Sequence, residues 1–268
     1  MCEAPALVIA FYRVLGAVLI LIPARILRPG REAERFSPAA ALAGVLLGLH
    51  WGIWIRSVQV TTVASAVFLV STQPVFAALL GRFLLGERVG RAAAGGIATA
   101  VGGVALIAGA DGGGRLTGNL LAVFAAVLGA GYLLIGRRAR TRMNFLPYLV
   151  QVYASAAASL GLLVAWFREP LYPYPPSTWF WIGMLAVFCS LLGHGTLNWA
   201  VRRMPAYLVN LAILLEPVLA TLYALFLFGQ RPGALLIPGA ALVVGGLAAA
   251  FLDEGRRGRE AFPPGAPP

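Results

Sequence analysis

Long apolar segments recur along almost the whole chain, and they limit its fold more than any other feature. They lie near residues 5–24, 39–58, 62–84, 92–109, 118–136, 144–167, 178–200, 206–228 and 234–252. Each is close to the roughly 20 residues that an α-helix needs to cross a bilayer. Charged residues make up only 12% of the chain, against about 25% in soluble domains. The sequence therefore predicts an all-α polytopic membrane protein with nine transmembrane helices.

The arginines are divided unequally between alternate loops, which indicates how the chain is oriented. All 21 basic residues are arginine; sixteen lie in one set of loops, four in the other, and Arg13 lies within a span. Because cytoplasmic loops carry the excess of positive charge, we expect the first set and the C-terminus in the cytoplasm. These positions account for the net charge of +11 without a nucleic-acid partner. The Arg, Ala and Gly usage is typical of a GC-rich genome, and we expect a bacterial inner membrane.

The chain repeats itself at a constant offset. Residues 74–105 align with 217–248 at an offset of 143, and 15 of 32 positions are identical, including Pro74 with Pro217 and Gly102-Gly103 with Gly245-Gly246. The loop at 86–91 belongs to the arginine-rich set, whereas its partner at 229–233 does not, so the repeats have opposite orientation. Inverted repeats are the architecture by which many secondary transporters alternate access. We expect both Gly-Gly pairs to permit close helix packing.

The two halves differ in their number of spans. We assign residues 1–109 to a first repeat of four helices, 110–252 to a second repeat of five helices, and 253–268 to a disordered cytoplasmic tail. The span 118–136 has no counterpart in the first half. By symmetry we expect the counterpart to lie upstream of residue 1, as a first helix that is missing here.

Several segments resemble the EamA-type transporters of the drug/metabolite transporter superfamily over the whole chain. They are AFYRVLGAVLIL (10–21), LLGLHWGIWIRSV (46–58), QPVFAALLGRFLLGER (73–88), LLGHGTLNWAVRRMPA (191–206) and LEPVLATLYALFLFGQR (215–231). The resemblance implies ten helices in two inverted five-helix repeats and export of amino acids, metabolites or drugs. Arg13 matches the family's second-helix arginine, Pro74 with Gly86-Glu87-Arg88 the first-half motif, and Glu216-Pro217 the second-half motif. Gln73 and Gln230 stand where the family has glutamate.

Glu216 and Arg13 are ionisable residues inside predicted spans. Such residues are costly in hydrocarbon and mark substrate or proton pathways by default. We expect Glu216 to be a proton-coupling or substrate-binding carboxylate, or a carboxylate held by another helix. Arg13 holds an anionic substrate group or anchors the structure, with Glu216 as its candidate partner. Pro74 and Pro217 remove one helix bond each, which predicts paired bends around one site.

A second group of polar and aromatic residues falls on matching helices of the two halves. His194 and Asn198 are four residues apart and share a helix face, as do His50 and Trp54. We expect these four and Gln73 to line a cavity, with interhelical hydrogen bonding as the alternative. Weaker candidates, for which packing is the favoured interpretation, are Trp51, Gln151, Tyr153 and Asn210.

The motifs of other protein classes are not recognisable in the sequence. Cys2 and Cys189 have no partner at metal spacing, and we expect no enzyme activity, cofactor or metal. The favoured function is a secondary active exporter of a small metabolite, an amino acid or a drug, with possible proton coupling. The alternatives are a lipid-linked or nucleotide-sugar-type carrier or flippase, and a non-transporting membrane subunit. The expected partners are the substrate, protons and the bilayer, and a monomer and a homodimer both remain open.

Overall fold

Helices form all of the regular structure in the part of the chain that the computed structural model describes, which is residues 4–27, 36–108, 115–216, 218, 219, 226 and 235–261. The elements are α1 (Ala6–Leu27), α2 (Pro38–Val60), α3 (Val63–Val70), α4 (Gln73–Leu85), α5 (Arg91–Ala108), α6 (Leu116–Arg140), α7 (Phe145–Trp166), α8 (Pro176–Met184), the π-helix η1 (Leu185–His194), α9 (Gly195–Ala200), α10 (Ala206–Ala212) and α12 (Leu236–Ala261).

Seven helices of the described residues are long and apolar enough to cross a membrane. They are Ala6–Leu27, Pro38–Val60, Ser65–Leu85, Leu116–Arg140, Phe145–Trp166, Pro176–Ala200 and Ile237–Arg257, and Arg91–Leu106 is a shorter apolar helix. Of the eighth predicted span, 206–228, the structure describes α10 and only some of the residues beyond it. The prediction of an all-α polytopic membrane protein is confirmed.

Two of the predicted spans are interrupted at corresponding places. The first breaks between α3 and α4 at Ser71 and Thr72, immediately before Gln73 and Pro74, where Pro74 occupies the first turn of α4. In the second half α10 ends at Ala212 and residues 213–214 form a turn. The offset of 143 maps 213–214 onto 70–71, so the two halves lose regular helix within one residue of the same point. Pro217 itself lies outside the described residues.

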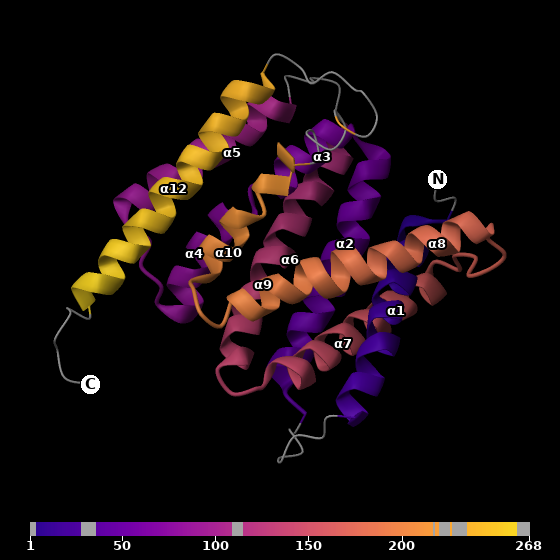
Figure 1. The fold of residues 1–268 in the computed structure, drawn as a ribbon. Coiled ribbons are helices and arrows are strands. Elements are labelled where there is room, and N and C mark those ends of the chain that lie inside the picture. The colour runs from indigo at the N-terminus through magenta and orange to yellow at the C-terminus, as the bar shows by residue number, and fades with distance from the viewer. Residues whose placement is uncertain are drawn as a thin grey trace.

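The packing of the helices brings the two halves of the sequence together. Helices α5 and α12 lie side by side (Figure 1), α2 packs on α6 and α7, α1 packs on α7 and η1, and α4 packs on α6 and α10. The buried core lies mainly between α1, α2, α6, α7 and the segment η1–α9. Helices from both repeats therefore enclose the same core.

Glycines of α5 and α12 show how the repeats are related. A Cβ on Gly96 would lie 2.5 Å from the Gly246 carbonyl oxygen, and one on Gly103 would lie 2.5 Å from the Gly239 oxygen. The helices are therefore antiparallel. The offset of 143 pairs Gly96 with Gly239 and Gly103 with Gly246, so each contact is the image of the other. A two-fold axis that exchanges antiparallel helices is perpendicular to them, and for membrane-crossing helices it lies in the membrane plane, as in inverted repeats.

The same glycines test the packing expectation for the Gly-Gly pairs. Gly103 and Gly246 make the close backbone contacts, which confirms the prediction for them. A Cβ on Gly102 or Gly245 would meet nothing within 4 Å. One glycine of each pair thus permits the close approach of α5 and α12, and its neighbour points elsewhere.

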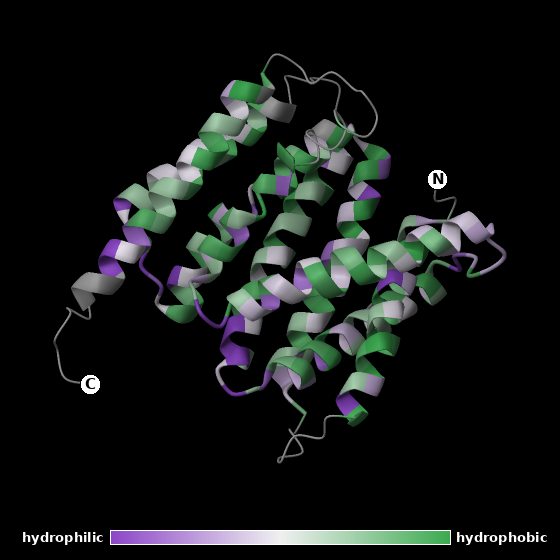
Figure 2. Ribbon diagram, in the orientation of Figure 1, coloured by the Kyte–Doolittle hydropathy of each residue, from purple (hydrophilic) through white to green (hydrophobic). Residues whose placement is uncertain are grey.

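Hydrophilic residues gather at the helix ends, and Figure 2 shows a group of them at one end of the bundle. This group includes the ends of α6 and α12 and the link between α4 and α5, which belong to the arginine-rich set of segments. Helix α12 continues to Ala261, so residues 253–261 are helical although we expected them in a disordered tail. Asp253 lies four residues before Arg257, whose Nη1 donates to the Arg88 carbonyl, and these contacts hold the helix end. Residues 262–268 lie outside the described part.

Candidate functional site

Arg13 is buried in the middle of α1 and contacts both halves of the protein. Its side chain is 6% exposed. Its Nε donates to the Ser190 hydroxyl of η1 at 2.8 Å, and its Cζ lies 4.0 Å from the centroid of the Trp51 ring on α2. A guanidinium over an indole gains more when the pair is desolvated, as here. The charge is therefore fixed in place by one residue from each repeat.

The Trp51 ring beside this guanidinium belongs to a connected series of aromatic contacts. Trp51 is 1% exposed, and the His194 ring meets it edge-on with centroids 4.7 Å apart. Tyr153 of α7 lies 6.4 Å from Trp51, and Tyr132 of α6 lies 6.3 Å from His194, both measured between ring centroids. We call the set Arg13, Trp51, Tyr132, Tyr153, Ser190 and His194 the Arg13 cluster. Its members come from α1, α2, α6, α7 and η1.

The π-helical segment supplies two of these side chains. Helix α8 changes at Leu185 to i→i+5 bonding, which continues to His194 before α9 resumes the α-helix. Wider turns of this kind are rare and occur frequently at functional sites. Ser190 accepts from Arg13 through its hydroxyl, and its carbonyl accepts from the Tyr153 hydroxyl. The segment therefore presents both a side-chain and a backbone acceptor to the cluster.

Some polar atoms of the Arg13 cluster are buried but make no hydrogen bond to any described residue. These are the Nδ1 of His194 and the hydroxyl of Tyr132. Among the described residues, the Arg13 guanidinium hydrogen-bonds only through Nε. Its two terminal nitrogens therefore remain as unused donors. Buried polar groups are nearly always hydrogen-bonded in proteins. The unused atoms are therefore available to a bound molecule.

Asn198 occupies a neighbouring position and is satisfied by the protein. Its Nδ2 donates to the His194 carbonyl at 2.8 Å, and its Oδ1 accepts from the Tyr148 hydroxyl at 3.2 Å. Asn198 is fully buried. Among the described residues its contacts are structural, as in the interhelical alternative that the sequence left open.

His50 and Gln73 are also buried, and they face α6 and α10. The Nδ1 of His50 lies 2.7 Å from the Ala125 carbonyl oxygen. The amide of Gln73 donates to the Asn210 side chain, which itself donates to the Ala206 carbonyl at 2.8 Å. A Cβ on Gly129 would lie 2.4 Å from Gln73 Oε1 and 2.9 Å from His50 Nδ1. These groups join α2, α4, α6 and α10 rather than the Arg13 cluster.

Glu216 and Trp54 complete the predicted residues. No direct ion pair joins Glu216 to Arg13 in the described residues, but the two charges lie within electrostatic range of each other. The Glu216 side chain is exposed. Trp54 has a buried indole N–H without a partner in the described chain. Its neighbour Trp51, which we had assigned mainly to packing, is the tryptophan that contacts Arg13.

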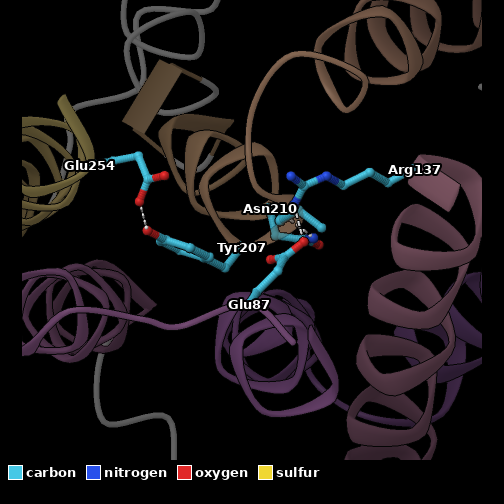
Figure 3. A network of polar contacts seen from close by, with 6 residues as sticks. Glu87, Arg137, Tyr207, Asn210 and Glu254 are labelled. Atoms are coloured by element: carbon cyan, nitrogen blue, oxygen red, sulfur yellow. Dashed lines mark hydrogen bonds and ion pairs between the residues drawn. The ribbon is translucent and has the colours of Figure 1, made fainter. Parts of the chain in front are cut away.

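A second polar network links α4, α6, α10 and α12 near their arginine-rich ends (Figure 3). Glu87, directly after α4, pairs with Arg137 of α6, and Tyr207 of α10 donates to Glu254 of α12 at 2.7 Å. Desolvation raises the pKa of the Glu87 carboxyl, while the charge of Arg137 and the backbone N–H of Ala206 oppose that rise. The network ties the first-half motif residue Glu87 to helices of the second half.

Sequence reasoning did not single out Ser190, Tyr132 and Arg137, and it assigned Trp51 and Tyr153 mainly to packing. A serine within an apolar run and four residues before His194 is a usable signal, because that spacing places both on one side of a helix. Tyrosine in place of phenylalanine inside a span signals a hydroxyl that needs a partner. Arg137 was counted only as a loop charge. Its pairing with Glu87 joins residues 50 positions apart, which no local pattern reveals.

No group of three or more His, Cys, Asp or Glu residues that could hold a metal ion occurs in the described chain. The comparisons with known proteins point instead to transport. A model of the EamA-like transporter family matches residues 1–109 and 116–252. The chain is 30% identical over 263 residues to a protein of Streptantibioticus cattleyicolor described as a "probable terminal-alkyne amino-acid exporter", and the match covers 93% of this chain and 85% of that protein.

A solved crystal structure is similar over 95% of this chain and 90% of its own, with a TM-score of 0.81. At 23% identity it shows a shared fold and nothing about the molecule transported.

Proposed function

Because the chain belongs to the EamA-like transporter family, we propose that it is a secondary active exporter of a small metabolite, an amino acid or a drug. Transport proceeds by alternating access across the bacterial inner membrane. The relative at 30% identity, described as an amino-acid exporter, supports a small organic substrate. The excess of arginine in one set of loops supports a cytoplasmic C-terminus.

The observation that carries this proposal is the composition of the Arg13 cluster. Arg13 and Trp51 belong to the first half of the sequence, and Tyr132, Tyr153, Ser190 and His194 belong to the second. A site divided between two inverted repeats changes its exposure when one repeat moves against the other. An isolated structural arginine does not need contributions from five helices.

The helix interruptions fit the same mechanism. Irregular backbone at membrane depth is tolerated where protein buries it or where it lines a water-filled space. The break at 71–72 precedes α4 and the break at 213–214 follows α10; they agree within one residue at the offset of 143, and α4 and α10 pack against each other. They supply bends at the contact between the two repeats, where a moving repeat needs flexibility.

Glu216 is the candidate for coupling to protons. It follows the second break directly and lies within electrostatic range of Arg13. Its side chain is exposed although surrounding protein atoms desolvate it, a combination that fits a group beside a concave space. An acid that loses and regains a proton there changes the field at Arg13 in each cycle.

The test is flux in proteoliposomes that contain the purified protein, with a pH gradient imposed and a panel of amino acids and drugs as solutes. We expect pH-driven flux of at least one solute, and Glu216→Gln should abolish its dependence on the gradient. Glu169→Gln, in the loop after α7, is the matched control and should leave flux unchanged. Equal pH-driven flux in Glu216→Gln and wild type would refute the coupling role. A folded protein without flux of any solute would favour the non-transporting subunit.

A further inference from the structure

We infer that the groove between α4 and α5 binds an anionic phospholipid, with Arg82 on the phosphate and an acyl chain along the apolar walls. The groove has a volume of about 370 Å³. It shares no residue with the Arg13 cluster, and its occupant belongs to the bilayer rather than to the transported solutes. The lipid site is therefore independent of the proposed transport function.

The groove exists because α4 and α5 pack on different partners. The short link 86–90 joins the two helices, but α4 packs on α6 and α10 whereas α5 packs on α12 (Figure 1). Ala94, Ile97 and Ala98 form the α5 wall of the groove. Because alanine side chains are short, they leave the space between the two helices open.

The α4 wall is one face of its helix. Val75, Ala78, Leu79 and Arg82 line the groove, and their spacing of three or four residues places them on one side of a helix. Arg82 lies in the last turn of α4, and Val75 lies two turns deeper, about 10 Å along the axis. Among the described residues that line the groove, Arg82 is the only charged one. The groove thus has a cationic end and an apolar part that runs along the span.

Hydrocarbon suits the apolar part of the groove better than water does. Roughly a dozen water molecules would be needed to fill the groove at about 30 Å³ each, and its alanine, valine and leucine walls offer them no hydrogen-bond partners. Helix α4 is part of the candidate span Ser65–Leu85, and α5 is a shorter apolar helix. Val75 and Leu79 are exposed on the protein surface. Acyl chains of the bilayer are therefore the apolar groups that reach this space.

The charge at the other end of the groove selects the headgroup. Arg82, Arg88 and Arg91 are exposed where α4 ends and α5 begins, and no ion pair joins their side chains to another described residue. The nearby carboxylate of Glu87 is turned to Arg137 instead (Figure 3). Helix α5 has no acidic residue in its first turn, so the positive end of its dipole adds to the same field.

A phospholipid combines the two chemistries in the order that the groove presents them. The stem of Arg82 can lie along apolar surface while its guanidinium reaches the level of the headgroups. An arginine binds a phosphate through two parallel N–H groups, and basic pockets between membrane helices bind anionic head groups. With the phosphate on Arg82, an acyl chain passes Ala78 and Ala98 toward Val75. Net negative charge on the headgroup is favoured because three arginines face it.

Lipid titration of the purified full chain, followed by native mass spectrometry, tests the site. Dioleoyl phosphatidylglycerol is the anionic probe, dioleoyl phosphatidylcholine has the same chains without net charge, and glycerol phosphate has the phosphate without chains. We expect phosphatidylglycerol to bind more tightly than phosphatidylcholine and to resist displacement by glycerol phosphate. Arg82→Gln should weaken phosphatidylglycerol by about fivefold, the usual effect of one arginine near an anionic membrane surface. Unchanged binding of phosphatidylcholine would show that this variant is folded.

Matched variants separate the charge of the groove from its shape. Arg138 of α6 is exposed at the same arginine-rich end but lies outside the groove, so Arg138→Gln should bind both lipids like wild type. Ala98→Leu adds bulk inside the groove and should weaken both lipids. Ala92→Leu makes the same change at an exposed position of α5 outside the groove and should weaken neither.

Four outcomes would overturn the lipid site. They are equal affinity for the two lipids, the same loss of phosphatidylglycerol in Arg82→Gln and Arg138→Gln, full lipid binding in Ala98→Leu, and displacement of the lipid by glycerol phosphate. A dimer of the chain that forms in place of the lipid adduct and is lost in Ala98→Leu would also overturn it, because the groove would then be an interface between two copies.

Discussion

Replacing Gly246 by alanine should separate α5 from α12 and destabilise the protein. The added Cβ would lie 2.4 Å from the Gly96 carbonyl oxygen and 2.8 Å from the Ala100 nitrogen. Carbon atoms normally stay about 3.5 Å or more from their non-bonded neighbours, so the helices must separate by roughly 1 Å. Both obstructing atoms belong to the backbone and cannot rotate away. Overpacking of this kind costs about 1–3 kcal/mol.

The neighbouring glycine provides the control. A Cβ on Gly245 would meet nothing within 4 Å, and alanine in a helix interior gains up to about 1 kcal/mol over glycine. This gain applies at both positions and cancels in the comparison, so Gly246→Ala and Gly245→Ala should differ by the overpacking cost of about 1–3 kcal/mol in the free energy of unfolding. Thermal unfolding of each variant in detergent measures the difference. Equal melting temperatures for the two variants would refute the close packing.

The inverted symmetry extends this prediction to α5. Gly103→Ala should be as harmful as Gly246→Ala, and Gly102→Ala as harmless as Gly245→Ala, because the offset of 143 exchanges these positions. Gly96 and Gly246 face each other, so alanine at both should cost less than the sum of the single effects, because the first substitution already separates the helices. Additive costs would indicate that the two glycines act at unrelated contacts.

Two further predictions concern polar contacts between the repeats. Burial raises the pKa of Glu87 in the folded protein above its ordinary value of 4.5. The stability that Glu87 contributes is therefore complete below the ordinary pKa and is lost as the pH rises through the raised pKa. Glu87→Gln should remove this pH dependence from the melting temperature, and Arg137→Gln should move the pH dependence to higher pH. An unchanged pH profile in both variants would contradict the assignment. Gln73→Leu should cost about 1–3 kcal/mol by leaving Asn210 without its partner, and the double variant Gln73→Leu/Asn210→Leu should cost less than the two single changes together. Chemical unfolding of the four proteins measures this coupling, and strictly additive energies would argue against the hydrogen bond.

The fold was largely predictable because two physical constraints act on every residue of such a chain. Each backbone group in the membrane must be paired internally, which makes every long apolar segment a helix. Repetition at a fixed offset then requires two copies of one arrangement. Given the contact of Gly96 with Gly246, the inverted repetition requires the matching contact of Gly103 with Gly239, but which helices meet was not predictable. The end of α12 was less predictable, because residues 253–261 are polar and are held by a contact with Arg88 that is remote in sequence.

The site was predictable only in part, because the sequence shows how deep a residue lies in a span but not which way its side chain points. Arg13 and His194 were selected by depth and lie in one cluster. His50 was selected in the same way, yet its imidazole turns to Ala125 while the next residue, Trp51, reaches Arg13. Adjacent residues on a helix point about 100° apart, so the packing of the helix decides which one enters the site. The π-helix from Leu185 to His194 adds a further rotation that a regular period does not anticipate.

Symmetry of packing and asymmetry of charge are separate properties of this protein. The α5–α12 contact is reciprocal, and each half has a break at the equivalent point. The polar residues are not repeated symmetrically in this way. Gln73 is neutral, buried and bonded to Asn210, whereas its equivalent Glu216 is ionisable, exposed and close to the charge of Arg13. A carboxylate in place of the buried Gln73 would be a buried charge that needs its own partner, and in the sequence Arg13 is the only arginine centred in a predicted span. A single ionisable pair therefore suits the one site that the two repeats share, while the glutamine holds the repeats together on the other side.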